Sequence, residues 1–82
     1  MKLPRDLSST DLEKSLRRTL GYEFTRQVGS HRRVTTLVGG QHHLTIPQHD
    51  PIRLGTLRAI LGEIMEHHHV SLDELLAKLG LR

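Results

Sequence analysis

Residues 22–47 read YEFTRQVGSHRRVTTLVGGQHHLTIP, and this stretch decides the fold. Two turn signals, Gly29-Ser30 and Gly39-Gly40, divide it into three segments rich in β-branched and apolar residues. Apolar and polar side chains alternate along the first segment, which is typical of a half-buried strand. A glycine pair between two such segments favours a hairpin. The stretch therefore predicts three antiparallel strands over about residues 22–28, 31–38 and 41–46.

The glycine pair also sets the expected register of the second hairpin. If the two glycines form its loop, Arg33 faces Ile46 and His31 faces Gln48. His31 then lies at the rim of the apolar face, close to the segment that carries His49. A slip of one residue would reverse the two faces of the sheet.

Arg26 interrupts the alternation of the first strand. By simple counting it falls on the same side as Tyr22, Phe24 and Val28. We therefore expect either that its side chain emerges at the sheet edge or that a β-bulge intervenes in this strand.

The segment before the strands predicts an amphipathic helix. Ser8 is a suitable N-cap, Thr10 offers a second capping register, and Gly21 ends the helix. The outward-facing cations of this helix are candidate ligands for the phosphates of an RNA backbone, with solvated surface charge as the alternative. These cations are Lys14, Arg17 and Arg18.

Two further helices follow the strands. The second opens at Thr56 or just before it, and apolar residues recur at helical spacing over residues 57–65. Ser71 caps a short third helix that Gly80 ends. The order is α-β-β-β-α with an extra short C-terminal helix, so we expect an α+β fold whose three-stranded antiparallel sheet is backed by helices on one face. This is the layout of a double-stranded-RNA-binding domain.

Length and composition narrow the class of protein. Eighty-two residues predict a single domain over residues 1–82, and the absence of cysteine excludes disulfides and thiolate chemistry. No apolar run approaches the roughly 20 residues of a membrane span, and the N-terminus lacks a secretory pattern, so we expect a cytoplasmic protein without membrane contact. Residues 1–33 hold eight basic and four acidic residues, which favours a phosphate-bearing partner.

The histidines are the candidate catalytic groups. An imidazole titrates near neutral pH and can move protons without a metal, and His31 sits directly after a turn. The runs at residues 42–43 and 67–69 are different, because neighbouring side chains on a strand or helix point in different directions. We therefore expect no metal site and no cofactor.

Three short motifs identify a known family by resemblance. The motifs are Gly-Ser-His at residues 29–31, Ile-Pro-Gln-His at residues 46–49 and Gly-Thr-Leu-Arg-Ala-Ile-Leu at residues 55–61. At matching spacing, and together with residues 20–27, they closely resemble the HicA-type toxins of bacterial toxin–antitoxin pairs. The resemblance implies a small mRNA-cleaving toxin that a HicB-type antitoxin holds inactive, with His31 as the catalytic histidine.

The residues suit metal-free RNA cleavage, in which the ribose 2′-hydroxyl attacks the adjacent phosphorus. His31 fits the role of base or acid, and the candidates for the other role are His49, His42 and a solvent proton donor. Guanidinium groups match phosphate oxygens, and Arg58 can meet phosphate or the antitoxin. The predicted phosphate ligands near His31 are Arg26, Arg32 and Arg33, and the predicted structural turn residues are Gly29, Ser30 and Gly55.

Two other classes of function remain open from the sequence. A non-catalytic double-stranded-RNA-binding module would explain the fold and the basic half, but not the Gly-Ser-His motif. A DNA-binding regulator is suggested by residues 71–80, which resemble the first helix of a helix-turn-helix but lack a following recognition helix.

Overall fold

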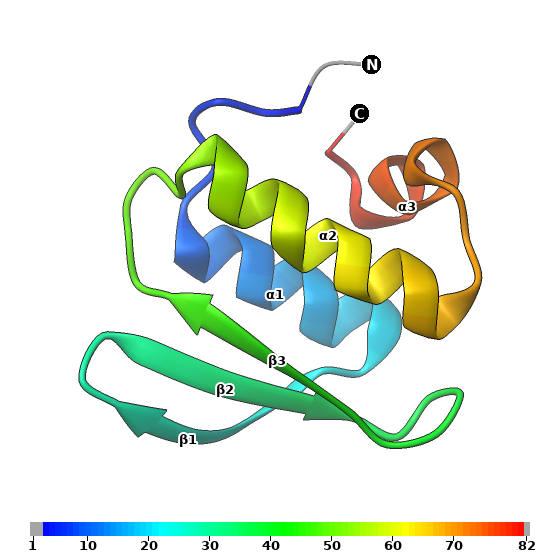
Figure 1. Cartoon of the computed structure of the whole chain (residues 1–82), viewed down its shortest axis with the longest axis horizontal. Coiled ribbons are helices and arrows are strands. Elements are labelled where there is room, and N and C mark those ends of the chain that lie inside the picture. The colour runs from blue at the N-terminus through cyan, green and yellow to red at the C-terminus, as the bar shows by residue number, and fades with distance from the viewer. Residues whose placement is uncertain (1–2, 82) are drawn as a thin grey trace.

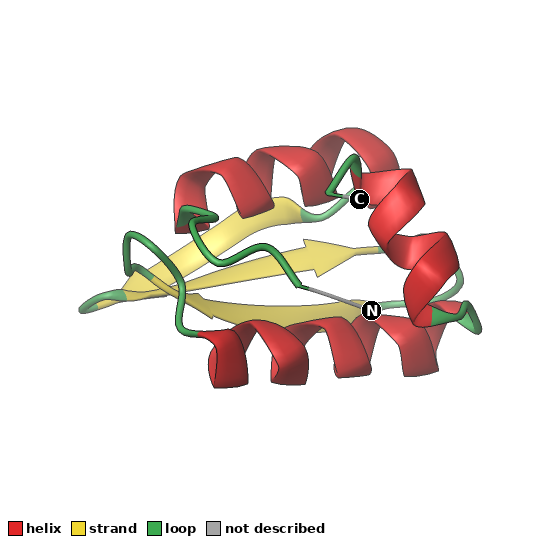
Figure 2. Ribbon diagram, turned by 90° about the horizontal axis from the view of Figure 1, so that it is seen from above, coloured by secondary structure: helices red, strands yellow, loops and turns green. Residues whose placement is uncertain are grey.

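The computed structural model describes residues 3–81, so residues 1, 2 and 82 of the predicted domain lie outside the described part. Helices cover one face of a three-stranded antiparallel sheet with strand order β1-β2-β3 (Figure 1, Figure 2). The predicted α+β fold and element order are confirmed. The elements are α1 (Ser9–Leu20), β1 (Glu23–Val28), β2 (His31–Thr36), β3 (His42–Pro47), α2 (Leu54–His68) and α3 (Leu72–Leu79).

The helix ends follow from capping residues. The Ser8 hydroxyl accepts a hydrogen bond from the backbone N–H of Asp11, and Gly21 ends α1 in the left-handed conformation, both as predicted. Ser71 and Glu74 form the predicted capping box of α3. The helix α2 begins at Leu54 without a side-chain cap.

The predicted register of the second hairpin is wrong by one residue. Five residues, 37–41, connect β2 to β3, so that His31 faces Pro47 and Val34 faces Leu44. The physical reason is burial: this register places Val34 and Leu44 together in the core, whereas the predicted one would have turned Val34 out to solvent. His31 consequently lies on the uncovered face of the sheet and not at the rim of the apolar face.

The expectation of a half-buried first strand is also wrong. Every residue of β1 is exposed, and only Tyr22, just before the strand, is buried. The helices α1 and α2 pack against β3, at the opposite edge of the sheet. As an edge strand beyond the helix layer, β1 has no helix against which to bury its apolar side chains.

One hydrophobic cluster lies between the sheet and the helices. The fully buried Leu12 and Leu16 of α1 meet Leu57 and Ile64 of α2 in this cluster. The helix α3 completes it with three leucines, and the buried Ser15 hydroxyl donates a 2.6 Å hydrogen bond to the carbonyl oxygen at the end of α3. The three leucines are Leu75, Leu76 and Leu79.

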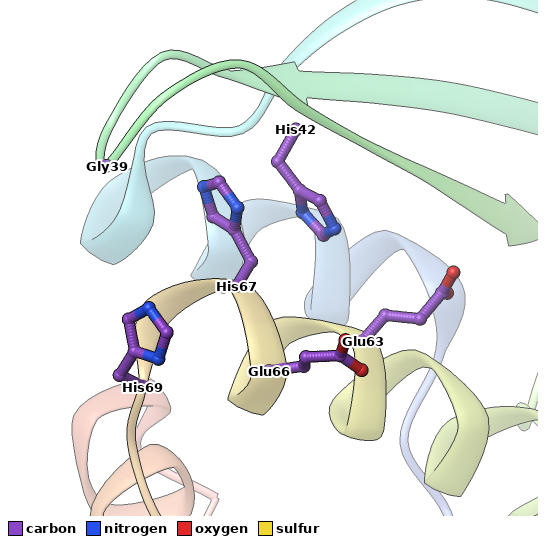
Figure 3. Close-up of a pocket in the computed structure, with 6 residues that line it drawn as sticks. All are labelled: Gly39, His42, Glu63, Glu66, His67 and His69. Carbon is purple, nitrogen blue, oxygen red and sulfur yellow. The ribbon is translucent and has the colours of Figure 1, made fainter.

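A histidine cluster joins the sheet to the end of α2. The buried Tyr22 hydroxyl bonds to His42 Nδ1 at 2.8 Å and to His68 Nε2 at 2.9 Å. The His42 ring stacks on His67, with centroids 4.3 Å apart, and His67 Nε2 lies 3.1 Å from the Val38 carbonyl oxygen. We call Tyr22, His42, His67 and His68 the histidine corner; its outer side opens into a hollow of about 470 Å³ that Glu63, Glu66 and His69 also line (Figure 3).

Candidate functional site

His31 is the first residue of β2 and is exposed beside the β1–β2 turn. Gly29 lies in this turn with a φ of 58°, a left-handed conformation that a side chain disfavours. The Ser30 carbonyl oxygen accepts a 2.7 Å hydrogen bond from the Gln48 backbone N–H. The turn that carries His31 is therefore tied to the chain segment leaving β3.

A small hollow on the uncovered sheet face contains His31. Its volume is about 170 Å³, and all three strands contribute to its lining. We call it the His31 hollow; it is lined by Arg26, Val28, His31, Arg33 and Thr45.

The cross-strand register explains why these side chains meet. Arg26 faces Arg33, Arg33 faces Thr45, and Val28 faces His31, and partners in an antiparallel pair project from the same face. Within residues 3–81, neither Arg26 nor Arg33 forms a salt bridge. The hollow thus presents an imidazole and two guanidinium groups that have no carboxylate partner in the described part of the chain.

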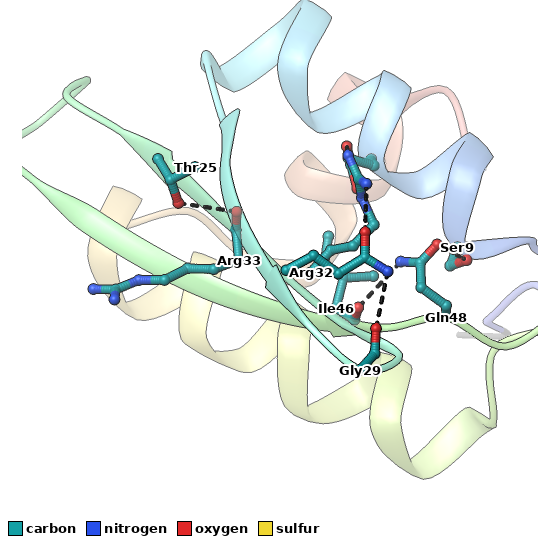
Figure 4. A network of polar contacts seen from close by, with 9 residues as sticks. Ser9, Thr25, Gly29, Arg32, Arg33, Ile46 and Gln48 are labelled. Carbon is teal, nitrogen blue, oxygen red and sulfur yellow. Dashed lines mark hydrogen bonds and ion pairs between the residues drawn. The ribbon is translucent and has the colours of Figure 1, made fainter.

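A β-bulge at Thr25 directs Arg26 into the hollow. Between Phe24 and Arg26 the first strand advances by two residues, while β2 advances only from Val34 to Arg33. The Thr25 hydroxyl donates to the Arg33 carbonyl oxygen at 3.0 Å (Figure 4). Of the two explanations that the sequence left for Arg26, the bulge is confirmed, and it turns the guanidinium to the face opposite Phe24.

Arg32 leaves β2 on the side opposite Arg33 (Figure 4). It forms two hydrogen bonds with the Glu13 carboxylate of α1, at 2.8 and 2.9 Å, and a third with Gln27. Its guanidinium carbon also lies 4.0 Å from the centre of the Phe24 ring. The hydrogen bonds to Glu13 raise the pKa of Arg32 above its ordinary value. The structure therefore does not bring Arg32 to the His31 hollow.

The other predicted cations lie elsewhere as well. Lys14 and Arg17 line a separate hollow on the helix side, beside the Glu13–Arg32 pair, and Arg18 is exposed on α1. Arg58 borders an apolar groove between α2, Leu3 and Leu72. None of these four side chains lines the His31 hollow.

The two additional histidine candidates differ in position. His42 lies on the helix side in the histidine corner, so the sheet separates it from His31. His49 is exposed two residues beyond Pro47, the strand partner of His31, and its backbone carbonyl accepts from the Ser9 N–H at 3.3 Å. His49 therefore lies two residues from the strand partner of His31, but it does not line the His31 hollow.

Gly55, a predicted turn residue, lies inside a helix. Gly55 lies in the first turn of α2 without a left-handed φ, and an added Cβ would meet nothing within 4 Å, so the predicted turn role does not hold.

Within residues 3–81, no three His, Cys, Asp or Glu side chains are grouped to hold a metal ion.

Sequence reasoning missed two members of the hollow, Thr45 and Val28. Both follow from the true register, since Thr45 is opposite Arg33 and Val28 is opposite His31. The signal was the apolar pattern of β2 and β3: Val34 is the one apolar residue of β2, and pairing it with Leu44 buries it.

Comparison with known proteins places the chain in a family. The family model described as HicA toxin of bacterial toxin-antitoxin matches residues 9–65, which is more than half of the chain. The chain therefore belongs to the HicA family and is a toxin of a bacterial toxin–antitoxin system. No curated protein and no solved structure matches it. In the part of the chain that the structure describes, no helix has the length and apolar character to cross a bilayer.

Proposed function

We propose that this toxin is an endoribonuclease that cleaves mRNA by metal-independent acid–base catalysis at His31 and is neutralised by a HicB-type antitoxin. Membership of the HicA family supports a nuclease. The observation that carries the proposal is the His31 hollow, where an exposed imidazole lies beside two guanidinium groups that form no salt bridge within residues 3–81.

The reaction needs one base, one acid and positive charge. His31 takes the proton from the ribose 2′-hydroxyl, whose oxygen forms a bond to the adjacent phosphorus while the bond from phosphorus to the 5′-oxygen breaks. Arg26 and Arg33 neutralise the charge that builds up on the phosphorane oxygens. The departing 5′-oxygen takes a proton from His49 or from water. The products are a 2′,3′-cyclic phosphate and a 5′-hydroxyl, and DNA is not cut because it lacks the nucleophile.

We also infer from the surface around the His31 hollow how the antitoxin neutralises the toxin. A basic site on an uncovered sheet face is silenced by a partner that brings carboxylates and bulk to it. We assign the HicB-type antitoxin this role, with Arg26 and Arg33 as its charged contacts. Electrostatic attraction of this kind mainly accelerates association.

The first test is incubation of the purified toxin with labelled mRNA in EDTA. We expect cleavage with cyclic phosphate and 5′-hydroxyl ends, and no cleavage of DNA of the same sequence. Intact RNA together with measurable binding would contradict the proposal and favour the alternative, a non-catalytic double-stranded-RNA-binding module.

A further inference from the structure

The uncovered face of the sheet continues past the His31 hollow. The register arranges its outward side chains in three rows across the strands, and the helices lie on the other side. The first two rows form the hollow and its border. They consist of Val28, His31 and Pro47, and of Arg26, Arg33 and Thr45. The third row consists of Glu23, Thr35 and His43.

A chain of hydrogen bonds fixes how His43 presents its ring. The Thr25 hydroxyl donates its only proton to the Arg33 carbonyl oxygen, at 3.0 Å. In its 3.4 Å contact with Thr35, Thr25 must therefore accept, so the Thr35 hydroxyl donates. With its own proton used, Thr35 can only accept from His43 Nδ1, 2.8 Å away. A neutral His43 consequently carries its proton on Nδ1 and offers Nε2 as an acceptor.

His43 is too far from His31 to act on the same phosphate. Thr35, its strand partner, is four residues beyond His31 on β2, which corresponds to roughly 13 Å along an extended strand. A catalytic acid or base must lie within about 3 Å of its proton. A role for His43 therefore concerns a neighbouring nucleotide.

The chemical character of the rows changes along the uncovered face, from basic in the hollow to hydrogen-bond accepting in the third row. The hollow offers the cations Arg26 and Arg33, which suit phosphate, while the third row offers two acceptors, Glu23 and His43 Nε2. Acceptors repel phosphate oxygens and attract base N–H groups. Adenine and cytosine carry exocyclic amino groups, whereas the single N–H of uracil lies between two carbonyl oxygens that the Glu23 carboxylate would repel.

We propose that single-stranded RNA lies across this uncovered face, and that His43 is a specificity-determining residue whose Nε2 accepts a hydrogen bond from the amino group of a base next to the cleaved linkage. The proposal rests on the RNA-cleaving function of the His31 hollow. Histidine rings and arginine planes are surfaces on which unpaired bases stack, and this face has two of each. The cations of α1 that would suit a duplex backbone lie on the helix side.

The test measures binding apart from cleavage. The His31→Ala protein, which should leave RNA intact, is titrated with labelled oligo-A, oligo-C and oligo-U and with an RNA duplex of equal length. We expect oligo-A and oligo-C to bind about 3- to 10-fold more tightly than oligo-U, the value of one hydrogen bond. Adding His43→Ala should remove this preference, and Thr35→Val should weaken it. The control His69→Asn, an exposed histidine at the end of α2, should leave it unchanged.

Three outcomes would overturn the proposal. One is a base preference that His43→Ala does not alter. The second is tighter binding of the duplex than of single strands, weakened by Arg17→Gln and not by Arg33→Gln. The third is an effect of His43→Ala on antitoxin binding alone, which would make the face a protein interface. Failure of RNA cleavage by the wild-type toxin would instead count against the proposed function, because the base preference is measured without cleavage.

Discussion

Two adjacent arginines show how strongly side-chain direction decides a role in this molecule. Arg32 and Arg33 follow His31 directly, and their chemistry is identical. Because strand residues alternate between faces, Arg32 meets Glu13 on the helix side and Arg33 enters the His31 hollow. We infer a structural role for the first and a phosphate-binding role for the second.

Substitution of each arginine by glutamine separates these roles. We expect Arg33→Gln to slow RNA cleavage on the order of 10²-fold, the cost of removing one group that stabilises charge in the transition state, with little change in Tm. Arg32→Gln should lower Tm, because it breaks the paired contact with Glu13, and should largely preserve the cleavage rate. Cleavage lost in Arg32→Gln at an unchanged Tm would contradict this division.

For single residues, the sequence predicts which residue types gather near His31, but it does not predict which face of the sheet each side chain takes. The Gly-Ser-His motif points to His31 after a turn, but of the three arginines predicted beside it, Arg26 and Arg33 line the hollow whereas Arg32 pairs with Glu13. Which arginines accompany His31 depended on the register and on the bulge at Thr25. Both the register and the bulge depend on which side chains the core can bury. A local sequence pattern does not determine this, because it depends on how the helices pack against the sheet.

Among the elements, the contact between the hairpin and α2 depends on neutral histidines. Burial lowers the pKa of His42 and of His68, and the neighbouring His67 acts in the same direction on both. Burial likewise raises the pKa of Tyr22 to about 12. The Tyr22 hydroxyl can donate its single proton to only one of its two histidine partners, so the other histidine must donate a ring N–H to the hydroxyl oxygen, and the histidine that accepts the proton must be neutral.

This contact predicts a pH-dependent stability. Since the folded-state pKa values of His42 and His68 lie below the unfolded value of about 6.5, the unfolded chain binds more protons as the pH falls below 6.5. Stability should therefore be complete above about pH 6.5 and decline toward pH 5. Urea midpoints between pH 5 and 7.5 should show a smaller decline for His42→Gln than for wild type, with His43→Gln as the matched exposed control. Equal pH dependence of the wild type and His42→Gln would contradict the role of the corner.

The elements also show what local patterns can and cannot establish. Ser8, Gly21, Ser71 and Gly80 act through their immediate neighbours, so the ends of α1 and α3 could be predicted. The length of the loop over residues 37–41 could not, because a glycine pair is compatible with both a two-residue and a longer turn. The exposure of β1 depends on where the helices come to lie.

For the whole molecule, the two faces of the sheet carry different groups of side chains. The helix side holds the hydrophobic cluster, the Glu13–Arg32 pair and the histidine corner, all of which stabilise the fold. The uncovered side holds the His31 hollow and the row of His43. The helix α3 lies outside the region matched by the family model and packs on the helix side, so it adds to the core without covering the hollow.

We propose that one exposed imidazole on the uncovered face, that of His31, performs the proton transfer in RNA cleavage. The most direct test compares single-turnover cleavage of a bound RNA by wild type and by His31→Ala in EDTA. We predict a rate lower by about 10²–10⁴-fold for His31→Ala, with unchanged Tm and unchanged RNA binding. Cleavage by His31→Ala at a rate near that of wild type would show that His31 does not transfer the proton.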